Sequence, residues 1–321
     1  MTSSRVPAIY GAATFGSLGR FAKVEDVAEA QKYIDLLVSH GHNAIDTSRV
    51  YGAGTSEEVI SKLDLKDAFV VVDSKIFPVK PGDHSPKRLK ELVKESVAAL
   101  NGVKIRTMYL HKPDPSVPFE ETVGAIDELY KQGLFESFGL SNYLSWEVSE
   151  IVTICRLKGY VAPTVYQGIY NFIDRVNEAE LFPCLRRFNI RFAAFSPLAG
   201  GLLTGIFADQ TTLDANLRFN PASGIPWYRT RYAHATPVLQ RLQSSLAAHQ
   251  LTLREVAARW LVHHSQLRPD DLGIIYGASK LSQLEEALVD HAKGPLPEVV
   301  LTAVENAWLE LKPYVPLYNM P

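Results

Sequence analysis

The chain has 321 residues, and 33 lysines and arginines against 35 aspartates and glutamates leave a formal net charge of −2. This balance argues against a nucleic-acid or anionic-membrane surface, which would need an excess of basic residues. With 46% hydrophobic and 21% charged residues the chain can bury a large core, so wholesale disorder is excluded. Two cysteines are too few for a disulfide framework or a cysteine-based zinc site. Neither a signal peptide nor a run of about 18 apolar residues is evident, so we expect a cytoplasmic protein that does not engage a membrane.

Short apolar runs alternate with segments of helical apolar spacing along most of the chain. The runs predict strands at 9–12, 44–46, 69–72, 106–110, 135–139, 164–166, 190–195 and 272–276. The spacing predicts helices at 24–39, 86–100, 119–132, 146–157 and 179–188. Ser85-Pro86 and Pro118 stand where an N-cap and a first-turn proline belong.

Eight strands that alternate with helices favour a parallel sheet, and eight is the number that closes a (β/α)8 TIM barrel. The competing doubly wound sheet usually carries a glycine fingerprint after its first strand, and Gly11-Ala-Ala-Thr-Phe-Gly16 does not match it. We therefore predict one α/β barrel domain over residues 1–321. Residues 204–235 form a long lid-like loop after the seventh strand, and 297–321 form an extra C-terminal helix with a tail.

Active sites of such barrels lie at the C-terminal ends of the strands. Seven consecutive predicted strands end in polar or titratable groups, an aromatic ring or a glycine-rich turn. These are Asp46 with Tyr51 beyond it, Lys75, His111, Ser141 with Asn142, Gln167, Phe195 with Ser196, and Gly277 to Ser279. The whole set in register predicts an active site at this end of the barrel.

Asp46, Tyr51, Lys75 and His111 form a coherent set for carbonyl chemistry. A tyrosine, with an ordinary pKa of about 10, is a useful acid near neutral pH only if that pKa is brought down. A neighbouring ammonium from Lys75 would favour the phenolate, and Asp46 would keep the lysine charged in a water-poor pocket. His111 could donate a hydrogen bond to a carbonyl oxygen. The set lacks an electron source, so a hydride cofactor is implied.

Longer segments of the chain resemble the aldo-keto reductase family, nearest its aflatoxin-aldehyde-reductase-like branch, over nearly the whole length. The matching segments are Ala44-Ile-Asp-Thr-Ser48 with Tyr51-Gly-Ala-Gly54, Ser74-Lys75, Tyr109-Leu-His111, Gly139-Leu-Ser-Asn-Tyr143, Thr164-Val-Tyr-Gln167, Ser196-Pro-Leu-Ala-Gly-Gly-Leu-Leu-Thr-Gly205 and Gly277-Ala-Ser-Lys-Leu-Ser-Gln283. Together these motifs are highly specific, although several alone would mean little.

By this resemblance, Tyr51 is the general acid, Lys75 lowers its pKa, Asp46 holds Lys75, and His111 orients the substrate carbonyl. The resemblance implies that Ser141, Asn142 and Gln167 bind the nicotinamide carboxamide of NADPH, with Phe195 stacked on the ring. It places the pyrophosphate against Ser196, Pro197, Leu198, Gly200, Gly201, Leu203 and Gly205. It places the adenosine 2′-phosphate against Gly277, Ser279, Lys280 and Gln283, and the adenine against Glu286.

Two residues depart from the family pattern. Gln283 stands where many relatives carry an arginine on the 2′-phosphate, and Ala287 stands where they carry an adenine-binding asparagine. The preference for NADPH over NADH is therefore open. Lys280 and Arg218 could compensate, because a point charge still favours a 2′-phosphate.

The loop at 204–235 carries Tyr228 and Arg231, which the branch resemblance implies as substrate residues, the arginine binding a carboxylate of semialdehyde-type substrates. The alternative is a solvated loop with scattered packing aromatics. No metal is expected, because the neighbouring His263 and His264 point apart on a helix.

The prediction for function is NADPH-dependent reduction of aldehydes to alcohols, with ketones and dicarbonyls as further candidates. Two alternatives stay open. One is a nucleotide-binding regulatory subunit on the same scaffold, resembling the potassium-channel β subunits, and the other is a Schiff-base aldolase using Lys75. The expected partner is a small carbonyl compound, and the branch resemblance suggests a homodimer.

Overall fold

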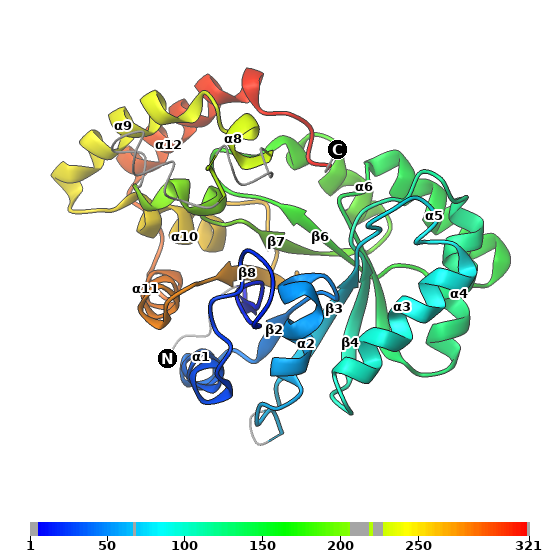
Figure 1. The fold of residues 1–321 in the computed structure, drawn as a ribbon. Coiled ribbons are helices and arrows are strands. Elements are labelled where there is room, and N and C mark those ends of the chain that lie inside the picture. Colours follow the sequence, from blue (N-terminus) through cyan, green and yellow to red (C-terminus); the bar gives the residue numbers. More distant parts are fainter. Residues whose placement is uncertain (1–5, 67–68, 206–217, 221–226, 320–321) are drawn as a thin grey trace.

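The computed structural model describes residues 6–66, 69–205, 218–220 and 227–319. Its centre is a closed barrel of eight parallel strands in chain order, with β1 paired to β8 (Figure 1). This confirms the predicted (β/α)8 TIM barrel. The strands are β1 (Ala8–Gly11), β2 (Ala44–Asp46), β3 (Val71–Ile76), β4 (Ile105–Leu110), β5 (Phe135–Ser141), β6 (Val165–Ile169), β7 (Arg191–Phe195) and β8 (Gly273–Gly277).

Apolar side chains fill the barrel and the layer between the strands and the surrounding helices. One cluster, which includes Ile9, Val165 and the ring of Tyr109, draws its members from several strands. The Tyr109 ring lies so close to Gly139 on the next strand that a Cβ there would come within 2.4 Å of it. Gly139 therefore provides the room that this ring needs on β5.

Helices follow the strands and cover the outside of the barrel (Figure 1). Local signals set several ends: Asp26 accepts a hydrogen bond from the Glu29 amide before α1, Pro86 opens α3, and Gly159 ends α5 in a left-handed conformation. The helices are α1 (Val27–Ser39), α2 (Thr55–Ile60), α3 (Pro86–Ala99), α4 (Phe119–Lys131), α5 (Ser145–Lys158), α6 (Leu181–Arg187), α8 (Trp227–Arg231), α9 (Ala235–Leu246), α10 (Leu253–His263), α11 (Leu281–His291) and α12 (Glu298–Leu311).

Two strand boundaries differ from the prediction in a way that matters for the site. β3 begins at Val71 rather than at residue 69, because Phe69 is 82% exposed with a left-handed φ of 51°. β3 ends at Ile76 and β6 at Ile169, beyond the predicted ends at 72 and 166, so Lys75 and Gln167 lie within these strands. Their side chains are held by the barrel itself rather than by a loop.

The region predicted as a long loop, 204–235, contains structure of its own. A 3₁₀ segment (Ala199–Thr204) enters it, α8 lies inside it, and α9 begins at Ala235. Residues 206–217 and 221–226 of this region lie outside the described residues. The predicted C-terminal helix is α12, which a short 3₁₀ turn follows at Lys312–Tyr314. Among the described residues, no helix is long and apolar enough to cross a membrane.

Candidate active site

A pocket of about 800 Å³ opens at the C-terminal ends of the strands. Most of the residues predicted from the strand ends and motifs line it: Asp46, Tyr51, His111, Asn142, Gln167, Phe195, Ser196, Pro197, Leu198, Gly200, Gly201, Arg218, Tyr228, Gly277, Ser279, Gln283 and Glu286. The pocket thus extends from the titratable side chains of Asp46, Tyr51 and His111 to the start of α11. Its place is the one where a barrel positions its chemistry.

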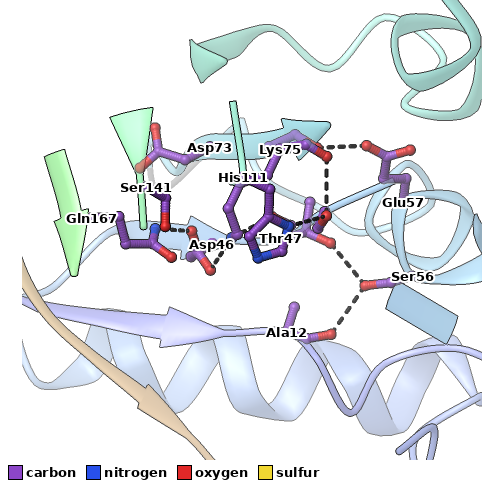
Figure 2. A network of polar contacts seen from close by, with 12 residues as sticks. Ala12, Asp46, Thr47, Ser56, Glu57, Asp73, Lys75, His111, Ser141 and Gln167 are labelled. Carbon is purple, nitrogen blue, oxygen red and sulfur yellow. Dashed lines mark hydrogen bonds and ion pairs between the residues drawn. The ribbon is translucent and has the colours of Figure 1, made fainter. Parts of the chain in front are cut away.

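Lys75 is completely buried and lies beside the pocket, where its ammonium joins β3 to the end of β2 (Figure 2). Its ammonium donates to Asp46 Oδ2 at 2.6 Å and to the Thr47 carbonyl at 2.7 Å. The other oxygen of the Asp46 carboxylate accepts from Gln167 Nε2 at 2.7 Å. The ion pair is therefore fully hydrogen-bonded at Asp46, which a buried pair needs to offset its desolvation.

The charge on Lys75 acts directly on Tyr51. The ammonium lies 5.1 Å from the centre of the tyrosine ring. Burial alone would lower the pKa of Lys75, but the Asp46 carboxylate and Tyr51 raise it above the usual value. The lysine consequently stays charged at neutral pH.

The pKa of Tyr51 itself corrects the expectation from the sequence. Burial raises the pKa of the phenol, and the Lys75 ammonium offsets only part of this rise. Tyr51 is thus protonated at neutral pH, the form that can give up a proton. Lys75 limits the loss of acidity caused by burial rather than bringing the pKa below its ordinary value.

The buried carboxylate of Glu57 stabilises the turn that carries Tyr51. Glu57 accepts from Arg49 Nη1 at 2.6 Å and from Ser74 Oγ at 2.6 Å, and Ser74 is the neighbour of Lys75 in β3. The turn runs through Gly52 with φ of 58°, where a Cβ would lie 2.9 Å from a backbone oxygen. The position of Tyr51 relative to Lys75 is therefore set by protein contacts on the far side of the turn.

His111 directly follows β4 and is the fourth titratable side chain of the site, after Asp46, Tyr51 and Lys75. Its ring stands edge-on to Tyr51 with 6.0 Å between the ring centres, and its Nδ1 lies 3.2 Å from Ser48 Oγ. Burial, followed by the charge of Lys75, lowers the pKa of His111 well below the usual value. The imidazole is neutral at neutral pH.

The next part of the pocket suits a carboxamide. Asn142 donates from Nδ2 to the His111 carbonyl at 2.8 Å and to Ser141 Oγ at 2.9 Å. Its Oδ1 is buried and has no hydrogen-bond partner among the described residues, and Asn142 lines the pocket. A buried acceptor without a donor is costly, so this atom fits a ligand that brings an N–H group. Ser141 supports Asn142 and does not itself line the pocket.

A glycine-rich turn lines the next part of the pocket. Gly200 and Gly201 both have positive φ, and a Cβ on Gly200 would lie 2.7 Å from the Tyr228 ring. Tyr228 also meets Ser196 Oγ at 2.5 Å and lines the pocket. Leu203 and Gly205 were predicted to contact the cofactor but do not line the pocket, and Leu203 is buried in the core.

At the α11 end of the pocket, the side chain of Gln283 binds the backbone that immediately precedes its own helix. Its Oε1 accepts from the backbone amides of Ser279 at 3.0 Å and Lys280 at 3.2 Å. These amides are the ones that an anion would contact at a helix N-terminus. Lys280 does not line the pocket, while Glu286 lines it and forms an ion pair with Arg254.

The structure does not support a substrate role for Arg231. Its side chain is 1% exposed, it forms a two-pronged ion pair with Asp174, and it donates to the Leu317 carbonyl at 2.7 Å. It does not line the pocket. A guanidinium with these buried partners holds α8 and the C-terminal tail together, so this expectation is corrected, whereas Tyr228 on the same helix does line the pocket.

Several pocket residues were missed from the sequence. The loop after β1 contributes Thr14, Phe21 and Lys23, and the start of α10 contributes Thr252 and Arg254. In the sequence, the Gly11-Ala-Ala-Thr segment is only a failed glycine fingerprint. The sequence does contain a signal for the start of α10: a threonine, Thr252, followed three residues later by Glu255 is typical of a helix N-terminus. In the structure Thr252 caps the helix by accepting from the Glu255 amide.

The closed eight-stranded barrel, the buried lysine–aspartate pair beside a pocket tyrosine, and the unsatisfied amide oxygen fit a barrel oxidoreductase. The aldo-keto reductase family model matches residues 7–308, and the chain belongs to the aldo-keto reductase family. Members of this family use nicotinamide cofactors.

Three similar proteins illustrate the relationship. The chain is 38% identical over 287 residues to an aldo-keto reductase of Pseudocercospora fijiensis, covering 87% of this chain and 97% of that protein. It is 40% identical over 284 residues to human aldo-keto reductase family 7 member A3, covering 84% and 86%. It is 36% identical over 321 residues to human aflatoxin B1 aldehyde reductase member 2, covering 96% and 89%. The predicted resemblance to the aflatoxin aldehyde reductases is confirmed.

Proposed function

We propose that this protein reduces aldehydes to alcohols with NADPH, and that Tyr51 supplies the proton. The observation that carries the proposal is the geometry of a protonated, pocket-lining phenol within 5.1 Å of a buried ammonium that Asp46 holds in place. Family membership supports carbonyl reduction in general. The NADPH requirement and the aldehyde preference are our proposal.

When bound, a nicotinamide cofactor would supply the hydride for the carbonyl carbon. The protein supplies what the oxygen needs as it becomes an alkoxide. The Tyr51 hydroxyl donates its hydrogen bond to that oxygen and then its proton, and the Lys75 ammonium stabilises the phenolate left behind. The phenolate forms next to a charge that cannot move away, because Asp46 and the Thr47 carbonyl fix the lysine.

The residues along the pocket fit the cofactor. Asn142 would hold the carboxamide through its unsatisfied Oδ1, and Phe195 would pack against the nicotinamide ring. The glycine-rich turn at Gly200 and Gly201 would border the pyrophosphate. These contacts concern the half of the cofactor that NADPH and NADH share.

The preference for NADPH rests on charge. Among the described residues, Lys23, Arg218 and Arg254 line the pocket together with the acids Asp46 and Glu286. Asp46 pairs with Lys75 and Glu286 with Arg254, so Lys23 and Arg218 give this lining its net positive charge. Such a lining attracts a polyanion, and a 2′-phosphate adds two charges to the cofactor. Gln283 acts against this preference because its side chain occupies the backbone amides of Ser279 and Lys280, just before α11.

The test is steady-state oxidation of NADPH, and separately of NADH, with an activated aromatic aldehyde and with a semialdehyde that bears a carboxylate. We expect turnover with NADPH that exceeds turnover with NADH at equal concentrations. Equal turnover with both nucleotides would remove the NADPH preference but keep the reductase. A protein that binds nucleotide, as measured by fluorescence, yet turns over neither aldehyde would contradict the proposal and favour a regulatory nucleotide-binding role.

A further inference from the structure

The turn that presents Tyr51 has a left-handed backbone. The three residues after the tyrosine, Gly52, Ala53 and Gly54, have φ values of 58°, 51° and 100°. For Ala53 this conformation is unfavourable, because its Cβ approaches the following carbonyl oxygen, and for the glycines it is only one of several accessible conformations. Contacts from outside the turn are therefore needed to keep this shape, and the direction of Tyr51 depends on it.

The side chain of Tyr51 is not oriented through its hydroxyl. Among the described residues no protein group forms a hydrogen bond with this hydroxyl, which leaves it available to a substrate in the pocket. The ring centre lies 5.1 Å from the Lys75 ammonium and 6.0 Å from the centre of the His111 ring, and neither contact is a directional bond to the phenol. The position of the hydroxyl thus depends on the backbone that carries the residue.

Arg49 joins this turn to the strand that carries Lys75. The Arg49 backbone amide donates to the Lys75 carbonyl at 3.0 Å, which ties the start of the turn to β3. The Arg49 side chain reaches forward along the chain, and its Nη1 donates to the Gly54 carbonyl at 3.3 Å. The guanidinium lies directly against Gly54, where it leaves no room for a Cβ. One residue therefore holds both ends of the segment that contains Tyr51.

The guanidinium of Arg49 is itself held by the buried carboxylate of Glu57. Nη1 donates to Glu57 Oε2 at 2.6 Å. The other oxygen of this carboxylate accepts from Ser74 Oγ at 2.6 Å and from the hydroxyl of Ser96 on α3. Because Ser74 directly precedes Lys75 in β3, the carboxylate that anchors Arg49 and the lysine belong to one strand assembly. A shift of the turn relative to Lys75 would break these contacts.

We propose that Arg49 is a positioning residue, which sets the place of the Tyr51 hydroxyl relative to Lys75. After burial, the charges that most affect the pKa of Tyr51 are those of Lys75 and Asp46, so Arg49 acts through geometry and not through its own charge. Geometry of this kind matters for rate, because misplacing a reacting group by about 1 Å can cost about 10²-fold.

The shape of the turn can be measured without catalysis, by hydrogen exchange of the full-length protein. The Tyr51 amide donates to the Ser48 carbonyl at 3.0 Å, and the Ala53 amide donates to the Val50 carbonyl at 3.3 Å. Both amides report whether the turn is formed. In Arg49→Met their exchange should accelerate by about tenfold or more, since local opening no longer breaks the contacts of the arginine. Exchange at the wild-type rate would overturn the proposal.

Arg186→Met is the matched control. Arg186 binds Asp271 through two hydrogen bonds of 2.6 Å, and the two side chains are 16% and 0% exposed. The corresponding values for the Arg49–Glu57 pair are 21% and 0%. Asp271 lies just before β8, at the end of the barrel opposite the pocket. Both variants leave a buried carboxylate unpaired, but only Arg49→Met should accelerate exchange in the turn. An equal acceleration in both would assign the effect to global stability and contradict the proposal.

Glu57→Gln weakens the same contact from the acidic side and serves if Arg49→Met does not fold. The amide oxygen of the glutamine can still accept from Ser74 and Ser96, whereas its nitrogen is a donor that would face the donor on Arg49. Exchange of the two turn amides should accelerate here by about threefold or more, the effect of one lost hydrogen bond. Wild-type exchange in a folded Glu57→Gln protein would contradict the proposal.

The catalytic consequence rests on the proposed function. Arg49→Met should lower kcat for aldehyde reduction by about 10- to 10²-fold, with the KM for aldehyde and nucleotide binding unchanged, because only the acid is displaced. Arg49→Lys, which keeps a charged donor, should lose less. Adding Ala53→Gly to Arg49→Met should restore kcat by about fivefold, since glycine adopts the left-handed conformation without the penalty that alanine has.

The kinetic and exchange results separate the two proposals. Wild-type kcat in Arg49→Met, or a loss of kcat that Ala53→Gly does not relieve, would contradict the positioning role. A wild-type protein without turnover would count against the proposed function alone, because hydrogen exchange in the turn does not depend on catalysis.

Discussion

The ammonium of Lys75 lies 5.1 Å from the centre of the Tyr51 ring. The lysine comes from the interior of β3 and the tyrosine from a turn after β2, so the barrel holds one partner and the turn holds the other. Burial raises the pKa of the tyrosine and the ammonium lowers it, and burial prevails. The pair is thus arranged to stabilise the phenolate once a proton has left, while keeping the phenol protonated beforehand.

Tyr51→Phe removes the proposed proton donor and keeps the aromatic ring. We expect turnover to fall by about 10²-fold or more, the usual scale for a positioned acid, with nucleotide binding unchanged. Aldehyde reduction and nucleotide fluorescence, measured on the same preparation, check both parts. Wild-type turnover in this variant would remove Tyr51 from the proposed role.

Lys75→Met removes the charge that stabilises the phenolate and leaves the Asp46 carboxylate without its ammonium partner. We expect a loss of turnover similar in scale to that of Tyr51→Phe, because the largest effect that lowers the pKa of the phenol is then gone. The double variant Lys75→Met/Asp46→Asn is the control, since it removes the unpaired buried charge. It should recover stability toward urea but not turnover. Recovery of turnover at neutral pH would show that the lysine acts on the fold rather than on Tyr51.

The parts of the site that the sequence predicted are those set by strand order. Asp46 ends β2, His111 follows β4 and Ser141 ends β5, and the ends of parallel strands meet at one edge of a barrel. The effect of Lys75 on Tyr51 was predicted with the correct sign, but the net pKa was not, because burial in the folded protein raises the pKa of the phenol by more than the neighbouring charge lowers it. Spacing along the chain carries no information on burial of that kind.

Arg231 shows a second limit of prediction from sequence. Its carboxylate partner, Asp174, is 57 positions away, and the carbonyl groups that it also contacts are 85 and 86 positions away. An arginine on a long loop between strands is equally compatible with a free lid and with a buried clamp. Only the packing of α8 against the tail distinguishes the two.

Arg231→Met should therefore destabilise the protein rather than alter substrate choice. Removing one member of a buried ion pair typically costs about 3–5 kcal/mol, because the other charge is left unpaired. Arg241→Met is the matched control: Arg241 and Glu310 form a surface pair with both side chains more than half exposed, which is worth about 0–1 kcal/mol. Urea unfolding of both variants provides the comparison. If Arg231→Met were as stable as wild type and lost activity only toward carboxylate-bearing aldehydes, Arg231 would be a substrate residue after all.

The protein should also lose stability in mild acid through His291. This side chain is buried, its Nδ1 lies 3.2 Å from the Tyr276 hydroxyl, and burial together with the nearby His42 lowers its pKa to about 3. The folded form thus keeps His291 neutral, whereas the unfolded chain binds a proton with a pKa of about 6.5. Stability is full above about pH 6.5 and falls as the pH drops toward 3, because the unfolded state takes up more protons.

At pH 5 this one histidine should cost about 2 kcal/mol relative to pH 7, since each pH unit below 6.5 is worth about 1.4 kcal/mol. The measurement is urea unfolding at the two pH values for the wild type, His291→Gln and the exposed-site control His249→Gln. His291→Gln should lose about 2 kcal/mol less on acidification than the wild type, whatever its stability at pH 7, and His249→Gln should follow the wild type. An equal loss in all three proteins would assign the acid sensitivity to other groups.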